Sequence, residues 1–175
     1  MITNFKDPSY LQMGNNRQQH AYNTLQKLEI FATLAPFDPV LTGTIPIEVD
    51  ISSSDLDVIC EVKDEPAFEK LIMTRYNHHA GFVIRKTKKQ GLPTIIINFR
   101  QEAYEIEIFG QALPVIEQMA YRHMVKEYET LQQKGPSFKK QVIELKEQGF
   151  STEIAFAQLL GIEGDPYLEL LKYAL

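Results

Sequence analysis

The hydrophobic pattern changes its period at Pro114, and this change constrains the fold more than any other feature of the sequence. Before Pro114, the segments 81–87, 94–99 and 104–109 are rich in the β-branched and aromatic residues that strands favour. After Pro114, apolar residues recur at helical spacing to the end of the chain. The sequence therefore predicts an α+β protein, with a mixed β-sheet carrying helices on one face in residues 1–114 and a C-terminal helical portion in residues 115–175.

Proline, glycine and capping residues mark the boundaries of the individual elements. We expect helices over 16–35 and from Asp64 to Tyr76, strands over 40–44 and 55–62, a hairpin connection over 88–93, and C-terminal helices over 115–133, 138–148, from Ser151 onward and after Pro166. The expected units are an α/β core with an N-terminal helix (1–114) and a C-terminal helical subdomain (115–175).

Two aspartates separated by one residue are the most informative candidates for chemistry. Asp55 and Asp57 lie in an apolar segment, and alternation along a strand places both side chains on the same face. Two carboxylates side by side repel each other, and burying them without a partner is costly. A divalent cation with a preference for oxygen ligands, such as Mg²⁺, would relieve that repulsion. The small turn at Gly43-Thr44 precedes them along the chain.

These residues resemble a known arrangement. The turn Thr42-Gly43-Thr44, the segment Ser54-Asp55-Leu56-Asp57-Val58 and a third acid, Glu105 or Glu107, are similar to the pattern of the nucleotidyltransferase superfamily of the DNA polymerase β type. The chain also resembles a bacterial family of unknown function, DUF4269, which is placed in that superfamily. The segments that carry this resemblance are Gly-Thr-Ile-Pro-Ile, Ser-Asp-Leu-Asp-Val-Ile-Cys, Glu-Ile-Phe-Gly-Gln and Ala-Tyr-Arg-His-Met. The second resemblance covers most of the chain, whereas the superfamily pattern covers about residues 41–109.

The resemblance implies a fold, a cofactor and roles for the residues that match. It implies a nucleotidyltransferase-like sheet that binds Mg²⁺ or Mn²⁺ through Asp55, Asp57 and Glu107, with Glu105 as the substitute third ligand. Glu107 is preferred because its context, Glu-Ile-Phe-Gly-Gln, is the more family-like. The same three acids would be the catalytic residues.

A second group of residues would contact the nucleotide. The resemblance implies that Gly43, Thr44 and Ser54 contact the phosphates of the nucleotide. Glycine at position 43 would permit close approach of the backbone to them. The basic run 85–89 supplies Arg85 and Lys86 as further candidates for the nucleotide. The alternative for that run is a solvated hairpin tip that protects an edge strand.

Three other groups of residues are candidates for a role. Gln118, Arg122 and His123 are spaced to share part of one helical surface and to line the cleft, with a core hydrogen bond as the alternative for His123. The pair 78–79, two histidines, is expected in a turn, and a zinc site there is not favoured. Cys60 is expected to be buried and to face away from Asp57.

The function that follows is transfer of a nucleoside monophosphate from a nucleoside triphosphate to a hydroxyl acceptor on a small molecule, a protein or RNA. Two alternatives stay open. One is an inactive module of the same fold that binds nucleotide or a partner protein, and the other is metal-dependent phosphodiester hydrolysis. The fold does not identify the acceptor.

Composition limits the setting in which this chemistry would occur. The net charge of −5 gives no general attraction to nucleic acid and argues against DNA as a partner. No apolar run approaches the roughly 20 residues of a membrane span. The first seven residues lack the apolar core of a signal peptide, and the chain has a single cysteine. We therefore expect a cytoplasmic protein, and the resemblance to DUF4269 implies a bacterial one.

Overall fold

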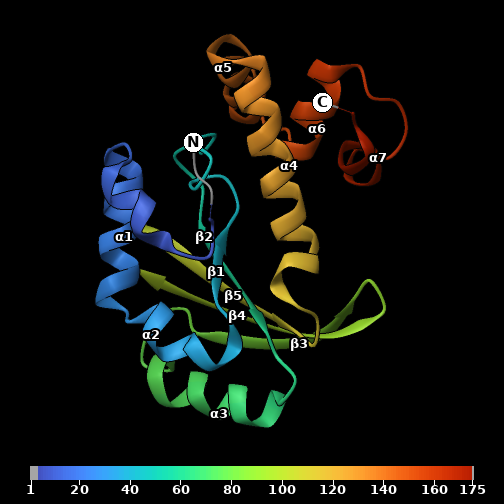
Figure 1. Cartoon of the computed structure of the whole chain (residues 1–175). Coiled ribbons are helices and arrows are strands. Elements are labelled where there is room, and N and C mark those ends of the chain that lie inside the picture. The colour runs from blue at the N-terminus through green and yellow to red at the C-terminus, as the bar shows by residue number, and fades with distance from the viewer. Residues whose placement is uncertain (1–3, 175) are drawn as a thin grey trace.

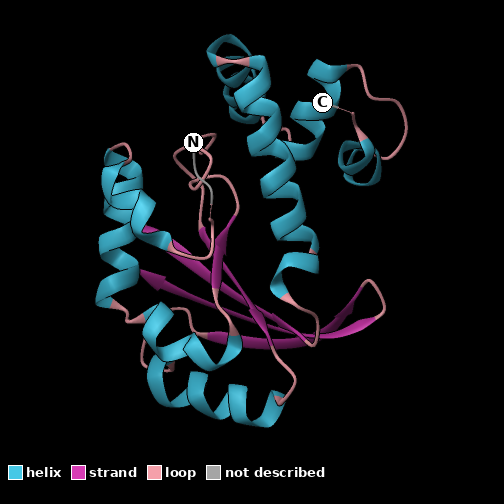
Figure 2. Cartoon of the chain, viewed as in Figure 1, coloured by secondary structure: helices cyan, strands magenta, loops and turns pink. Residues whose placement is uncertain are grey.

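One mixed β-sheet forms the centre of the molecule, with helices on both sides of it (Figures 1 and 2). The computed structural model describes residues 4–174. Within that range the strand order is β1-β2-β5-β4-β3; β2 and β5 run parallel, and the other neighbouring pairs are antiparallel. The strands are β1 (Val40–Thr42), β2 (Leu56–Glu61), β3 (Val83–Lys89), β4 (Leu92–Gln101) and β5 (Tyr104–Gln111).

Helices before and between the strands cover one face of the sheet (Figure 1). They are α1 (Asn16–Lys27), α2 (Ile30–Leu34) and α3 (Glu65–Tyr76), with short 3₁₀ turns at Pro8–Met13 and Ala35–Phe37. Their apolar side chains form one core with the sheet residues that alternate towards them. The helices contribute Leu25, Leu34, Phe68 and Ile72, and the strands contribute Val58, Cys60, Ile97, Ile106 and Ile108. The predicted α+β class, with helices on one face of a mixed sheet, is confirmed.

The chain after Pro114 is helical and lies on the other side of the sheet (Figure 1). Its helices are α4 (Met119–Lys134), α5 (Pro136–Glu147), α6 (Thr152–Leu160) and α7 (Pro166–Lys172), preceded by a 3₁₀ turn at Val115–Glu117. A second core joins these helices to Ile47 and Val49 of the loop between β1 and β2. The division into two domains at residue 114 stays a prediction.

The loop between β1 and β2 is fixed in place by α1. The amide of Gln18, which is buried, donates to the carbonyls of Ile45 and Pro46 at 3.0 and 3.2 Å. The guanidinium of Arg17 donates to the carbonyl of Ser54 at 3.0 Å. Because these bonds hold both ends of the loop, the turn after β1 and the start of β2 are positioned against each other.

Two helices predicted as continuous are interrupted. The segment 16–35 is divided because Glu29 adopts a left-handed conformation (φ 51°) between α1 and α2. The segment 115–133 is divided at Gln118, which is extended. The side chain of Gln118 donates to the carbonyls of Cys60 and Leu113, both at 2.9 Å, and these tertiary bonds favour the extended backbone over a continuous helix.

The other predicted boundaries of strands and helices differ from those in the structure by only a few residues. The first strand ends at Thr42, and β2 begins at Leu56, so Asp55 precedes the strand. Residues 78–79 lie in a turn, as predicted. Cys60 is also buried as predicted, in the core between the sheet and helices α1, α2 and α3. Among the helices of residues 4–174, none combines the length and the apolar character that a membrane span requires.

Candidate active site

The turn after β1 brings the backbone against an acidic side chain. Gly43 has a φ of 81°, and a Cβ at this position would lie 2.6 Å from Oδ2 of Asp57. Both the left-handed backbone and the close approach therefore require glycine. The next residue, Thr44, has its hydroxyl 3.1 Å from that of Ser54, which also accepts a hydrogen bond from the Ile51 amide at 3.0 Å. The turn is thereby joined to the residue that precedes Asp55.

Asp55, Asp57 and Glu107, the three acids that the sequence analysis preferred as metal ligands, line one cleft. Asp57 on β2 and Glu107 on β5 are partners across the parallel strand pair, so their side chains share a face. Asp55 is exposed at the entrance to β2, whereas Asp57 and Glu107 are half-buried. The cleft has a volume of about 490 Å³ and is also lined by Gly43, Thr44 and Ser54.

The alternative third ligand lies elsewhere. Glu105 is exposed, pairs with Arg100 of β4 through its backbone, and is absent from the residues that line this cleft. Glu107, by contrast, accepts a hydrogen bond at 3.2 Å from the side-chain amide of Asn98 on β4. The geometry places Glu107, and not Glu105, beside Asp57.

The crowding of negative charge perturbs Asp57. Burial, followed by the charges of Asp55 and Glu107, raises the pKa of the Asp57 carboxyl from 3.8 to about 8. The ammonium of Lys146 acts in the opposite direction but does not compensate. Burial and like-charge repulsion both disfavour the ionised form of Asp57, so positive charge among these carboxylates would be favourable.

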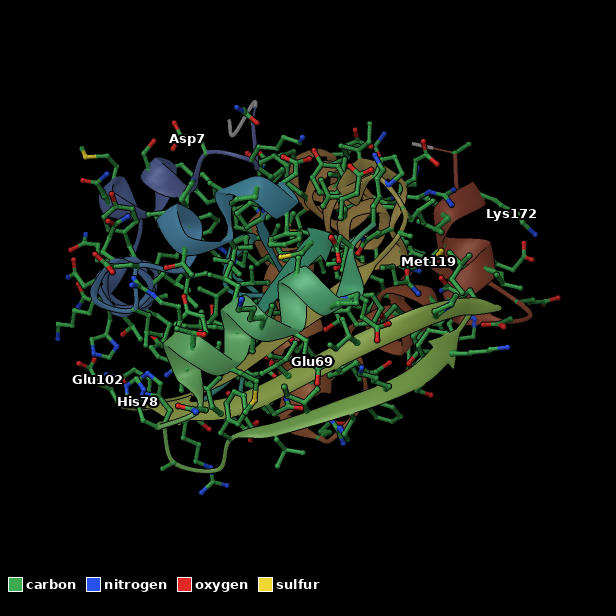
Figure 3. The ribbon with its side chains drawn as sticks, turned by 90° about the horizontal axis from the view of Figure 1, so that it is seen from below. Asp7, Glu69, His78, Glu102, Met119 and Lys172 are labelled. Carbon is green, nitrogen blue, oxygen red and sulfur yellow. The ribbon has the colours of Figure 1, made fainter. Side chains whose placement is uncertain are left out.

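The two basic candidates on β3 have different surroundings. Arg85 donates to the side-chain oxygen of Asn98 at 2.7 Å, so it connects through Asn98 to Glu107. The ammonium of Lys86 lies 2.8 Å from a carboxylate oxygen of Glu65 and 2.6 Å from one of Glu69, both on α3. Glu69 is labelled on that helix in Figure 3. The charge of Lys86 is therefore engaged by α3, and only Arg85 connects to the acidic cluster.

The surface predicted for Gln118, Arg122 and His123 does not form as a unit. The Gln118 side chain is buried, and its amide donates to the carbonyls of Cys60 and Leu113. Arg122 is exposed, and its guanidinium lies 4.0 Å from the sulfur of Met119. Only His123 of the three lines the cleft. The shared-surface prediction was wrong because a break at Gln118 precedes the helix.

The sequence analysis missed Lys146 and Glu153, which line the same cleft. Lys146 on α5 is buried, and its ammonium donates to the carbonyl of Val49 at 2.7 Å. Glu127 on α4 and Glu153 on α6 line the cleft with it. The four-residue spacing of Phe138, Val142 and Lys146, all buried, is the signal that could have identified the lysine, since it places Lys146 on the apolar face of its helix.

A second hollow adjoins the first. It has a volume of about 1130 Å³ and shares Glu107, Phe109 and His123 with the acidic cleft. It extends to the β3–β4 hairpin, where Arg85, Lys86 and Lys89 contribute to its lining. The acidic cleft therefore opens towards a larger, partly basic surface.

Several solved structures share this fold. A structure of the Cid1 poly(U) polymerase, H336N mutant bound to MgATP, has a TM-score of 0.55 at 12% identity, with 93% of this chain and 53% of that chain covered. A GLD-2/RNP-8 complex has a TM-score of 0.52 at 14% identity, covering 87% and 60%. A cytoplasmic RNA terminal U-transferase has a TM-score of 0.50 at 12% identity, covering 79% and 43%. This chain thus spans about half the length of these nucleotidyltransferases and has their fold.

The sequence comparisons give a family. A search of curated proteins found no match. Residues 23–173 match the family described as "Domain of unknown function (DUF4269)". The matched range includes β1 to β5, the acidic cleft and the whole of the C-terminal helices α4 to α7. Because the match extends over most of the chain, the protein belongs to the DUF4269 family.

Proposed function

We propose that the protein is a metal-dependent nucleotidyltransferase, which transfers a nucleoside monophosphate from a nucleoside triphosphate to a hydroxyl acceptor. The observation that carries the proposal is the pairing of Asp57 with Glu107 in one cleft, beside Asp55 and under the turn at Gly43. A nucleotidyltransferase fold and this acidic cluster support the same chemistry independently.

The donor set has the chemistry that a hard divalent cation prefers. Three carboxylates line the cleft, and the raised pKa of Asp57 marks negative charge that the surrounding protein does not neutralise. Among residues 4–174 the oxygens of these three acids are not all within 4.8 Å of one another, so the side chains would need to close on the metal. Oxygen ligands of this kind suit Mg²⁺ or Mn²⁺, and Asp55, Asp57 and Glu107 would hold the metal. When bound, the metal would neutralise phosphate charge and stabilise the attacking and leaving oxygens.

The protein groups would position the reactants. The turn at Gly43-Thr44 supports the phosphates, because the absence of a side chain at Gly43 lets the backbone come close to them. Glu107, oriented by Asn98, accepts the proton of the acceptor hydroxyl. The hydroxyl oxygen forms a bond to the α-phosphorus, the bond from that phosphorus to the bridging oxygen breaks, and pyrophosphate leaves with the electron pair.

The adjoining hollow is the proposed place for the acceptor. It shares Glu107 with the acidic cleft, so an acceptor hydroxyl there would lie beside the proposed base. Two of the similar structures are those of a poly(U) polymerase and an RNA terminal U-transferase. The 3′-hydroxyl of RNA is therefore the first acceptor to test for this chain, with small-molecule and protein hydroxyls next.

The test is transfer of label. The purified protein is incubated with each nucleoside triphosphate labelled at the α-phosphate, Mg²⁺, and short single-stranded RNA, proteins or a cell extract as acceptors. Label should move to one acceptor class, and Glu107→Gln should abolish the transfer. Glu105→Gln is the matched control on the same strand, and it should retain activity because Glu105 lies outside the cleft. Metal-dependent nucleotide binding without transfer to any acceptor would replace the enzyme with a nucleotide-binding module.

A further inference from the structure

A second group of metal-ligating side chains lies in the wall of the cleft, outside the proposed acidic site. His123 and Glu127 are four residues apart on α4, which places them on one face of the helix. Glu153 comes from the first turn of α6. One ligand atom from each residue lies within 4.8 Å of the other two.

The imidazole of His123 is the part of this group that ordinary packing does not explain. His123 is only 6% exposed, and within residues 4–174 neither ring nitrogen has a hydrogen-bond partner of ordinary geometry. The backbone carbonyl of Tyr167 lies near enough to favour the charged ring, but it does not complete a hydrogen bond of that quality. Two buried nitrogens without partners are costly, since a buried polar atom normally has at least one.

The carboxyl of Glu127 is likewise short of positive charge. Glu127 is 4% exposed, and burial, followed by the charge of Glu153, raises its pKa well above the ordinary value. Lys146 is the cation that opposes this shift, but its ammonium is also hydrogen-bonded to the Val49 carbonyl. The group thus combines an imidazole whose nitrogens have no hydrogen-bond partner of ordinary geometry among residues 4–174, a buried carboxylate and a second carboxylate around one point.

We propose that His123, Glu127 and Glu153 form a second cation site, separate from Asp55, Asp57 and Glu107, which binds a transition metal such as Zn²⁺. Nitrogen and carboxylate donors together suit Zn²⁺, whereas the all-oxygen acidic cluster suits Mg²⁺. The side chains would need to close slightly, because Zn²⁺ holds such ligands at about 2.0–2.2 Å. The site joins α4 to α6, so its metal would fix the helical wall shared by the two hollows.

The experiment separates the two metal sites by donor chemistry. Chelator-treated protein in excess Mg²⁺ is titrated with Zn²⁺ by calorimetry, both as wild type and as Asp55→Asn/Asp57→Asn. One Zn²⁺ should bind per chain in both proteins. Either His123→Ala or Glu153→Gln removes one of the three proposed ligands. Each should weaken that binding by about tenfold or more, because even the loss of a group that hydrogen-bonds to a metal ligand lowers metal affinity by about 10–100-fold.

Matched controls exclude binding elsewhere. His78 and His79 are adjacent, with ring centroids 4.3 Å apart, and are the alternative imidazoles for Zn²⁺. His78→Asn/His79→Asn should leave the binding intact, as should Glu129→Gln, which changes an exposed acid of the same helix. Zn²⁺ affinity unchanged by His123→Ala and Glu153→Gln, or lost in the His78/His79 variant, would overturn the proposal.

A spectroscopic measurement covers the case in which a variant folds poorly. Co²⁺ bound to the wild-type chain should give d–d absorption bands of a site with a nitrogen ligand. Glu153→Gln, at the partly exposed start of α6, should keep the apo melting temperature near that of wild type and should weaken those bands. A Co²⁺ spectrum identical in wild type and Glu153→Gln would also overturn the site. Neither readout depends on nucleotidyl transfer, so failure here leaves the proposed function untouched.

Discussion

Asp57 and Glu107 are direct partners across the parallel pairing of β2 with β5, although they lie in distant parts of the sequence. Parallel pairing places their side chains on the same face, and the turn at Gly43 closes over Asp57 from β1. This relationship gives the cleft its charge. It also determines how stability should respond to pH, metal and substitution.

Asp57→Asn should stabilise the metal-free protein, and the gain should grow with pH. The folded carboxyl keeps its proton up to a pKa of about 8, whereas the unfolded carboxyl loses it near 3.8. Wild-type stability is therefore lost as pH rises between these values, and asparagine removes that loss. Denaturant unfolding should show little difference near pH 4 and, at about 1.4 kcal/mol for each unit by which the pKa is raised, a gain on the order of 5 kcal/mol near pH 8. Excess Mg²⁺ should remove the gain, because it stabilises only the wild type.

Gly43→Ala should weaken metal binding more than it weakens the fold. Alanine meets both the positive φ, which costs about 1–2 kcal/mol, and the carboxylate of Asp57 at 2.6 Å. Gly91→Ala is the matched control, since Gly91 has a φ of 78° and open space where the Cβ would lie. Both variants should lose similar backbone stability, but only Gly43→Ala should lose Mn²⁺ affinity in calorimetry. Equal Mn²⁺ binding by the two variants would contradict the role given to the turn.

Arg85→Ala should reduce nucleoside triphosphate affinity, and Lys86→Ala should not. Arg85 reaches the acidic site through Asn98, whereas the charge of Lys86 is held by Glu65 and Glu69. The effect of Arg85→Ala should be larger at an ionic strength of about 0.01–0.1 M than at about 1 M, because salt screens exposed charges. Fluorescent nucleotide titrations at both salts measure this. A larger loss in Lys86→Ala would show that the hairpin moves away from α3 when nucleotide binds.

Gln118→Ala should cost stability without changing the site. Its buried amide donates to Cys60 and Leu113, so truncation leaves two carbonyls without that donor and should cost about 1–3 kcal/mol. The exposed neighbour Arg122 provides the control, since Arg122→Ala should change the free energy of unfolding little. Thermal and denaturant unfolding give the comparison. Impaired Mn²⁺ binding in folded Gln118→Ala would mean that this residue also positions the cleft.

Much of the fold could be predicted because its signals are local. The strands from Val83 to Gln111 follow from β-branched and aromatic runs, and Asp57 and Glu107 follow from a motif and its context. The breaks at Glu29 and Gln118 could not be predicted. A left-handed residue and side-chain bonds to distant carbonyls set them, and neither leaves a periodic signal.

The sequence by itself therefore determined the α+β class, the sheet-forming segments and the preferred acids, because hydrophobic period and short motifs act over a few residues. Only the tertiary structure decided that Lys86 pairs with α3, that Lys146 enters the cleft, and that His123, Glu127 and Glu153 meet. These neighbours depend on how α3 packs on the sheet and how α4, α5 and α6 pack on one another. The side chains of the whole interface set that packing, so no single segment of the sequence contains it.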